Sequence, residues 1–251
     1  MKKQKNKQVV SLDDFDNTIS LWQLLPSGVG SGLKRLKIII DSIQNSQVEQ
    51  SLKPLSLLLV GKQGLRTHGR AVIRALGLEY PCETPAHFLQ STQTEIYNYF
   101  NPTRLCDSYI ISSVSLLYTP TLKVLHEIIS SGRYSVFNNV RKATELIPVH
   151  YPVIMTTKNK KNIPEYFLEK IDHVVEIGDY TDQQLELIVL QRLKYSQVDY
   201  QEEKVLWLVK EYGIKNLNDI IRLLKDAITI MLAEGRTVLT VEDVKKVMSL
   251  S

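Results

Sequence analysis

One stretch, residues 57–77 (LLLVGKQGLRTHGRAVIRALG), constrains the fold more than any other part of the chain. Its four apolar residues, Leu57–Val60, predict a buried strand, and the glycines that follow predict a tight turn. An apolar-periodic helix, Ala71–Leu76, comes next. Parallel strands need a crossover connection, which is usually a helix, so a strand, loop and helix in this order are typical of a parallel sheet. The stretch therefore predicts an α/β domain.

The chain up to residue 179 contains the further elements that such a domain needs. The first strand extends from Leu55 to Val60, and the buried strands expected after it are Ser108–Leu117, Pro152–Thr156 and Val174–Ile177. The expected helices are Leu33–Ile43, a short one near Thr92–Phe100, and one that Thr119-Pro120 opens and that ends near Ser130. Residues 78–88 (LEYPCETPAHF) are punctuated by prolines, and we expect an irregular passage there. Two runs around a polar centre within Gly132–Val149 predict a β-hairpin.

The character of the sequence changes at Tyr180. Apolar residues then recur at helical spacing in four segments separated by turn signals, and the expected N-caps are Thr181, Asn216 or Asn218, and Thr240. We therefore divide the chain into a flexible basic tail (1–18), a large α/β domain (19–179) and a small helical domain (180–251).

Composition narrows the class of protein without naming a partner. The net charge is +4 and four lysines lie in the first seven residues, which indicates a solvated tail or an arm that contacts phosphates. Cys82 and Cys106 lie far apart, so we expect two reduced thiols and a cytoplasmic protein. No apolar run approaches the roughly 18 residues of a membrane span, and the N-terminus does not resemble a signal peptide. His126, His150 and His173 show no ligand spacing, so we expect no metal site.

Four stretches, in this order, resemble an AAA+ ATPase, and the most similar family is RuvB, the Holliday-junction branch-migration motor. They are LLLVGKQGL, DSYIISSVSLLYTPTLKVLHEII, GRYSVFNNVRKATELIPVHYPVIMTTKN and IPEYFLEKIDHVVEIGDYTDQQL. The resemblance runs from about Ser27 to Leu250. It implies an AAA+ P-loop NTPase-like parallel sheet followed by a small all-α lid. We expect no counterpart of the winged-helix domain that contacts DNA in RuvB.

The phosphate loop of the family is altered at its chemical positions. With Gly61 and Gly64 aligned to the first loop glycines, Arg66 replaces the last glycine, Thr67 the lysine and His68 the Ser/Thr. The lysine normally reaches the β- and γ-phosphates, and the hydroxyl binds Mg²⁺. Arg66 also places a long side chain where backbone should approach phosphate closely.

A shifted register that uses Gly69 and Arg70 restores a basic residue, but Ala71 follows it and offers no hydroxyl. We expect a relic loop that keeps only its turn geometry and no bound cofactor. The alternative is weak binding of ATP or ADP without normal hydrolysis.

The second ATPase strand ends in serines where the family has Asp-Glu. Ser112 and Ser113 occupy the positions of the Mg²⁺-orienting carboxylate and of the general base. A serine cannot serve as that base, whose contribution is typically about 10²–10⁴ in rate. Hydrolase elbows set a nucleophilic serine between glycines, which ISSVS lacks, so we expect no catalytic residue here.

The remaining positions of the family site follow the same trend. The sensor-1 threonines, Thr156 and Thr157, are intact. The arginine-finger segment becomes FLEKI, with Leu168 and Lys170 at the charged positions, and the sensor-2 arginine becomes Asn216. Residues that serve ATP are thus replaced at four places while the apolar framework remains, which indicates a fold kept for binding.

Basic and apolar side chains mark candidate contact surfaces. In RuvB the hairpin contacts the junction-binding partner protein, so the resemblance implies a protein interface at Val136–Pro148 with Phe137 and Val140 as exposed anchors. The basic residues of the hairpin and of the loop after the sensor-1 strand are Arg133, Arg141, Lys142, Lys158, Lys160 and Lys161. They form either a solvated face or a contact to DNA or a partner.

These observations favour a catalytically defective RuvB-like AAA+ subunit that binds other AAA+ subunits or DNA-processing proteins, in an oligomer or hetero-oligomer. It would serve DNA recombination or replication, with DNA as a further partner and no membrane. One alternative is an active or partner-activated ATP-dependent motor of the branch-migration or clamp-loader type. The other is a stand-alone DNA-binding module.

Overall fold

The computed structural model describes residues 31–45, 53–89, 93–101, 103–138, 142–195, 199–200 and 217–250. Contacts divide the chain into two compact units, one within residues 20–179 and one that contains residues 180–251. The expected basic tail, residues 1–18, lies outside the described residues. The two units are described in turn.

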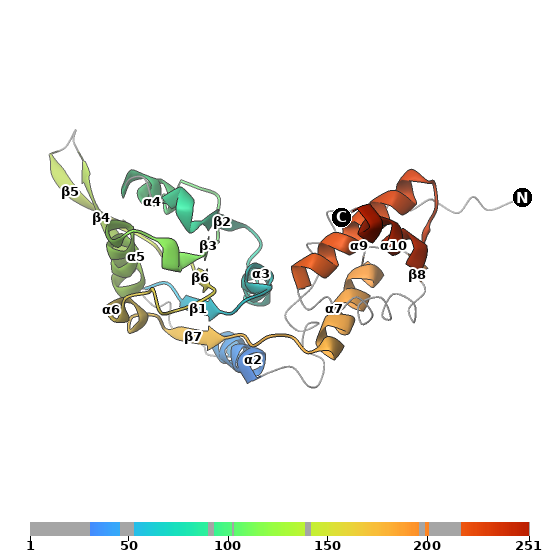
Figure 1. The fold of residues 1–251 in the computed structure, drawn as a ribbon. Coiled ribbons are helices and arrows are strands. Elements are labelled where there is room, and N and C mark those ends of the chain that lie inside the picture. Colours follow the sequence, from blue (N-terminus) through green and yellow to red (C-terminus); the bar gives the residue numbers. More distant parts are fainter. Residues whose placement is uncertain are drawn as a thin grey trace, which may run out of the picture. The chain divides into compact units, whose positions relative to one another are not determined.

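The first unit is built on a five-stranded parallel sheet with the strand order β2-β3-β6-β1-β7 (Figure 1). Its strands are β1 (Ser56–Val60), β2 (Pro81–Pro85), β3 (Ser108–Ser112), β6 (Val153–Thr157) and β7 (His173–Glu176). Each neighbouring pair runs parallel, with Leu58 opposite Met155 in β6 and opposite Val174 in β7. The predicted α/β domain with a parallel sheet is confirmed.

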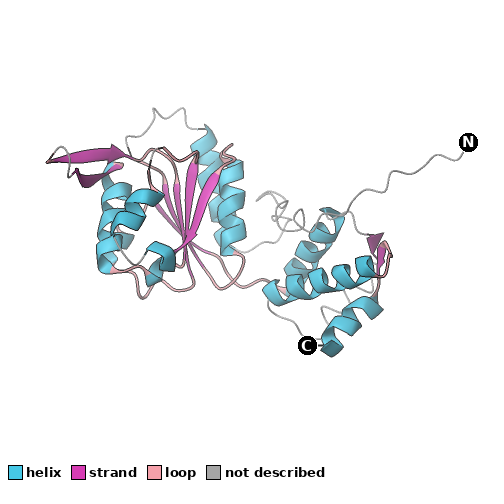
Figure 2. Cartoon of the chain, turned by 90° about the horizontal axis from the view of Figure 1, so that it is seen from above, coloured by secondary structure: helices cyan, strands magenta, loops and turns pink. Residues whose placement is uncertain are grey.

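Helices cover both faces of this sheet, as Figure 2 shows. They are α2 (Ser31–Asn45), α3 (Leu65–Ala75), α4 (Gln93–Tyr99) and α5 (Thr119–Ser131). Successive strand residues point to opposite faces. Leu57 and Leu59 therefore join the core under α2 and α3, while Leu58 and Val60 join the core under α4 and α5. Burial on both faces explains why β1 is a continuous apolar run.

Two local predictions in this unit are wrong. The strand expected at Ser108–Leu117 ends at Ser112, because Ser113 takes a left-handed conformation (φ 61°) and leads into the 3₁₀ helix η2 (Val114–Leu116). The Pro-punctuated passage contains β2 followed by the 3₁₀ helix η1 (Ala86–Leu89). Proline is tolerated at the ends of an edge strand, where no ladder hydrogen bond is lost.

The predicted hairpin is present. It consists of β4 (Arg133–Asn138) and β5 (Ala143–Pro148), paired antiparallel with Ser135 opposite Leu146 and Phe137 opposite Thr144. It starts directly after α5, whose end is set by Gly132 in the left-handed region (φ 70°). Figure 1 shows the hairpin extending beyond α5, away from the sheet.

Cys82 and Cys106 form a disulfide, with their Cα atoms 5.6 Å apart. The expectation of two reduced thiols is therefore wrong. Parallel pairing of β2 with β3 places the start of β2 beside the segment that leads into β3, so cysteines 24 positions apart in sequence meet. The prediction missed this contact because it did not include β2.

The second unit is helical, with α7 (Asp182–Tyr195), α9 (Leu217–Ala233) and α10 (Val241–Leu250). Two-residue strands, β8 (Asp199–Tyr200) and β9 (Val238–Leu239), pair in addition to the expected helices. The helix expected over residues 200–213 lies outside the described residues except for Tyr200, which belongs to β8.

Of the expected helix caps in this unit, Thr181 caps α7 through its side chain, whereas the Thr240 hydroxyl donates a hydrogen bond instead of accepting one. The Thr181 side chain accepts a hydrogen bond from the Gln184 N–H, and Gln184 bonds back to the Thr181 N–H, which is a capping box. Thr240 precedes α10, and its N–H and hydroxyl donate to the Asp243 carboxylate. Among the described helices, none combines the length and the apolar character that crossing a membrane requires.

Candidate functional site

The carboxyl ends of β1, β3 and β6 lie side by side, because these strands are neighbours in a parallel sheet. The phosphate-loop candidate leaves this edge at Gly61, whose N–H donates to the Thr157 carbonyl at 3.0 Å. A Cβ atom on Gly61 would lie 2.6 Å from the Ile177 carbonyl oxygen, so only glycine fits there. The loop therefore begins as tightly as the sequence predicts.

The loop turns into α3 at Gly64, which takes a left-handed conformation (φ 67°) and precedes the first helical residue, Leu65. The helix thus begins six residues before the apolar-periodic segment that predicted it. Gly69 packs within α3 against Ile110 and Ile154 of the sheet. A helix N-terminus at the carboxyl edge of a parallel sheet is the backbone framework of an anion site, and this framework is retained.

His68, which the resemblance predicts at the position of the Mg²⁺-binding hydroxyl, is turned into the protein. Its ring is buried, with 1% of the residue exposed, and Nδ1 lies 2.7 Å from the Gly64 carbonyl oxygen. Burial lowers the pKa of His68 to about 4, partly offset by the hydrogen bond to Gly64. The side chain is therefore a neutral core residue at neutral pH.

Arg66 and Arg70 are both held by one carboxylate, that of Glu83 on β2. Arg66 Nε lies 2.5 Å from Glu83 Oε2, and Arg70 donates to both oxygens, with Nη2 2.9 Å from Oε2. Burial disfavours the charged form of Glu83, but the hydrogen bonds and charges of Arg70 and Arg66 outweigh it, so its pKa lies below the ordinary value. The basic residue of the shifted register, Arg70, thus has a protein counter-ion.

Glu83 was not predicted as a residue of this site. In the sequence, Glu83 is only an isolated acidic residue between two prolines. It can be predicted to pair with arginines of α3 only once this passage is known to be a strand beside that helix. Thr67, at the lysine position, is half-buried within the first turns of α3.

Of the serines and threonines at the strand ends, Thr157 contacts Ser115 of η2 and nearby backbone. Thr156 and Thr157 are buried, and the Thr157 hydroxyl lies 2.9 Å from both Ser115 Oγ and the Asn159 carbonyl. Ser112 is half-buried at the end of β3, and Ser113 is exposed. None of these side chains carries the negative charge that helps to hold a metal ion.

The arginine-finger positions are likewise uncharged or exposed. Leu168 ends the short helix α6 (Glu165–Leu168) and packs against the apolar core, while Lys170 is exposed beyond it. Asn216, at the sensor-2 position, lies outside the described residues.

The hairpin presents an apolar pair to solvent. Phe137 is 57% exposed and Leu146 is 54% exposed. The register places them diagonally on one face, since Ser135 lies opposite Leu146 and Phe137 opposite Thr144. Arg133 and Lys142 are exposed as well; Val140 and Arg141 lie outside the described residues.

The lysines after β6 are exposed. Lys160 pairs with Glu176 at 2.6 Å, which reduces the positive charge of this loop. Within the part of the chain that the structure describes, Lys158 and Lys161 form no salt bridge with a carboxylate, and the Lys161 N–H donates to Asn159 Oδ1. The loop is therefore less basic than its sequence indicates.

Comparison with known proteins agrees with the order of these elements. No protein-family model and no curated protein sequence matches the chain. Among solved structures, the RuvB Holliday-junction branch-migration motor of Thermotoga maritima is similar, with a TM-score of 0.69 and 14% identity over 94% of this chain and 73% of that one. The ORC2 protein of Aeropyrum pernix, solved as ADPNP and ADP complexes, gives a TM-score of 0.62 and 13% identity over 94% and 71%.

These similarities and the parallel sheet define an AAA+ P-loop NTPase-like fold. More particularly, the chain has a RuvB-like AAA+ fold, as the sequence resemblance predicts.

Proposed function

We propose that this chain is a catalytically defective RuvB-like AAA+ protein, a binding subunit of a DNA recombination or replication assembly. The proposal rests chiefly on the charged groups that surround the loop after β1. The two arginines nearest the relic loop, Arg66 and Arg70, are engaged by Glu83, and the strand end that needs carboxylates has Ser112 and Ser113.

The residues present do not fit Mg²⁺ with a nucleoside triphosphate in the manner of an active AAA+ site. Such a site needs a lysine on the β- and γ-phosphates, a hydroxyl on the metal, and a carboxylate that prepares water. Here the corresponding residues are Thr67, a buried His68 and Ser113. We derive no hydrolytic step from this set.

The intact framework supports a binding role. The buried residues of β1, β3 and β6 are mostly apolar, and the buried polar ones, Ser56, Ser108, Thr156 and Thr157, carry no charge, so the sheet needs no nucleotide to organise it. RuvB-like folds suit oligomers with other AAA+ subunits, and a subunit without chemistry would serve there as a rigid body. Phe137 and Leu146 supply the exposed apolar pair expected of a protein interface.

A titration with a fluorescent ATP analogue in the presence of Mg²⁺ tests the loss of the nucleotide site. We expect no saturable binding in the micromolar range. Micromolar binding that Arg66→Ala or Arg70→Ala abolishes would instead favour the motor alternative. Lys123→Ala, an exposed change on α5, is the matched control.

The interface is tested by purifying the full chain from its native cell with a Phe137→Ser/Leu146→Ser variant alongside. We expect AAA+ or DNA-processing proteins to be recovered with the wild type and lost with the variant, while the thermal unfolding midpoint stays the same. Equal recovery by both would remove the hairpin from the proposal. DNA contact through Lys158 and Lys161 would show as affinity that falls steeply with salt.

A further inference from the structure

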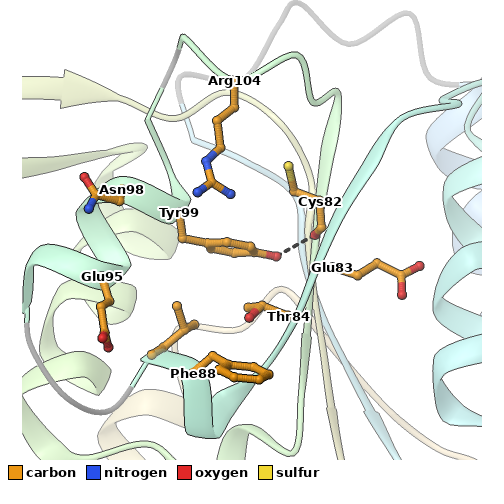
Figure 3. Close-up of a pocket in the computed structure, with 9 residues that line it drawn as sticks. Cys82, Glu83, Thr84, Phe88, Glu95, Asn98, Tyr99 and Arg104 are labelled. Atoms are coloured by element: carbon orange, nitrogen blue, oxygen red, sulfur yellow. Dashed lines mark hydrogen bonds between the residues drawn. The ribbon is translucent and has the colours of Figure 1, made fainter.

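A pocket lies on the far side of β2 from the relic loop, between this strand and one face of α4. Its cavity has a volume of about 350 Å³, within the range of small-ligand sites. Cys82 and Thr84 form the strand side, and Asn98 and Tyr99 lie on the helix side. In Figure 3, Glu83 points away from this pocket, consistent with its pairing to Arg66 and Arg70.

The two ends of the pocket differ in chemistry. Phe88, which is 63% exposed, lies at the end of the pocket beside the last residues of β2. Arg104 lies at the opposite end, beside the first residues of β2. Figure 3 shows the Tyr99 ring between them. The Tyr99 hydroxyl donates toward the Cys82 carbonyl at 2.5 Å and lies 3.1 Å from the Ile110 carbonyl, so the ring is fixed as a wall.

Arg104 is the cation of this pocket. Among the described residues, no carboxylate forms a salt bridge with it that the structure records, in contrast to Arg66, Arg70 and Arg236. An exposed guanidinium beside an aromatic wall is suited to a carboxylate ligand, which it can bind through two parallel hydrogen bonds.

The segment that carries Arg104 is held in place. The Thr103 N–H and hydroxyl donate to Asn101 Oδ1, and the Arg104 N–H donates to the Asn101 carbonyl. Two residues later, Cys106 is joined to Cys82 of the pocket wall by the disulfide. Such restraints lower the ordering cost of binding.

We propose that this pocket binds an elongated ligand with an aromatic or apolar group at one end and a single carboxylate at the other. The apolar group lies against Phe88 and Tyr99, and the carboxylate pairs with Arg104. Two sources share this chemistry, the C-terminal residues of a partner chain and a free aromatic acid. This site is independent of the lost nucleotide chemistry.

The charge of the lining limits the ligand to one negative group. Glu95 also lines the pocket and lies on the same face of α4 as Asn98 and Tyr99, at i, i+3 and i+4 spacing. The lining contains one cation, Arg104, and two carboxylates, Glu95 and the Glu83 that pairs with Arg66 and Arg70, so a polyphosphate or a nucleic-acid backbone meets no net positive field. The site therefore differs from the nucleotide edge in ligand class as well as in place.

Three probes test the proposal by NMR shift titration of the full oxidised chain: the dipeptide acetyl-Phe-Ala, its C-terminal amide, and 4-phenylbutyrate. We expect saturable shifts at β2, η1 and α4 with the free carboxylates, and roughly tenfold weaker binding of the amide, the loss typical of one charge-assisted contact. Tighter binding of the dipeptide than of phenylbutyrate identifies a chain terminus as the source. The reverse order identifies a small acid.

Variants separate the two ends of the site. Arg104→Gln should remove the preference for carboxylate over amide, whereas Phe88→Ala should weaken both dipeptides by the same factor. Both side chains are exposed, so neither change threatens the fold. Lys123→Gln on α5 should change nothing. Equal affinity of the wild type for carboxylate and amide, or shifts confined to other parts of the chain, would overturn the proposal.

Discussion

His68, expected from the resemblance at the position of a metal-binding hydroxyl, is a buried core residue in the structure. Burial disfavours the charged form of the His68 ring, and it lowers the pKa of this side chain to about 4. The unfolded chain, with an ordinary histidine pKa of 6.5, binds the proton first as the pH falls. Stability is therefore greatest above pH 6.5 and decreases as the pH falls toward 4.

This linkage gives a measurable pH dependence. We expect the free energy of unfolding to fall by about 2 kcal/mol between pH 7.5 and pH 5, a range in which most carboxylates stay ionised. Urea unfolding at a series of pH values measures it, and His68→Phe should lose most of this dependence. A wild type equally stable at both pH values would contradict the buried, neutral ring.

The Glu83 cluster makes a second prediction at the residue scale. The Arg70 side chain is 33% exposed and binds both oxygens, whereas the Arg66 side chain is 58% exposed. Because burial raises the cost of breaking an ion pair, Arg70→Ala should destabilise by about 2 kcal/mol and Arg66→Ala by less than about 1 kcal/mol. Chemical denaturation of the two variants gives the comparison, and equal losses would show that Arg70 is not the principal partner.

The sequence was enough to assign residues to site positions, but it did not predict which side chains those residues contact. The residues expected at the altered family positions, from Thr67 to Ser113, were assigned from the sequence once the strands had been predicted. Their partners cannot, because Glu83 lies 13 residues from Arg70 in sequence and meets it only through the parallel crossover.

At the scale of elements, the disulfide joins the start of β2 to the segment before β3. Closing a loop between residues 24 positions apart should stabilise the fold by about 3 kcal/mol, chiefly by restricting the unfolded chain. Thermal unfolding with and without a thiol reductant measures the difference. Cys82→Ser should be insensitive to reductant, and free thiols in the native oxidised protein would refute the bond.

The elements that were mispredicted share a physical reason. Apolar periodicity identifies β1, β6 and α5 because these elements are buried, and burial leaves a pattern in the sequence. The edge strand β2 is half-buried along its whole length and carries two prolines, so it leaves no such pattern. The break after β3 depends on the left-handed Ser113, and serine gives no warning of that conformation.

At the scale of the whole molecule, the order of strands and helices predicted the fold better than sequence identity did. A sequence identity of 14% leaves no match to any family model, yet 94% of the chain superposes on RuvB. The alternating cores on both faces of the sheet explain this result, because volume and burial can be kept while individual side chains change. The role of the molecule was not predictable in this way, since function depends on the site and not on the fold.

The rate of ATP hydrolysis by the full chain is the most direct test of the claim that the fold is kept without its chemistry. Phosphate release should be measured with Mg²⁺, with and without DNA, for the wild type and for Thr67→Ala and Arg70→Ala. The account predicts a rate at background for all three proteins. A Mg²⁺-dependent rate well above background that either substitution abolishes would contradict it.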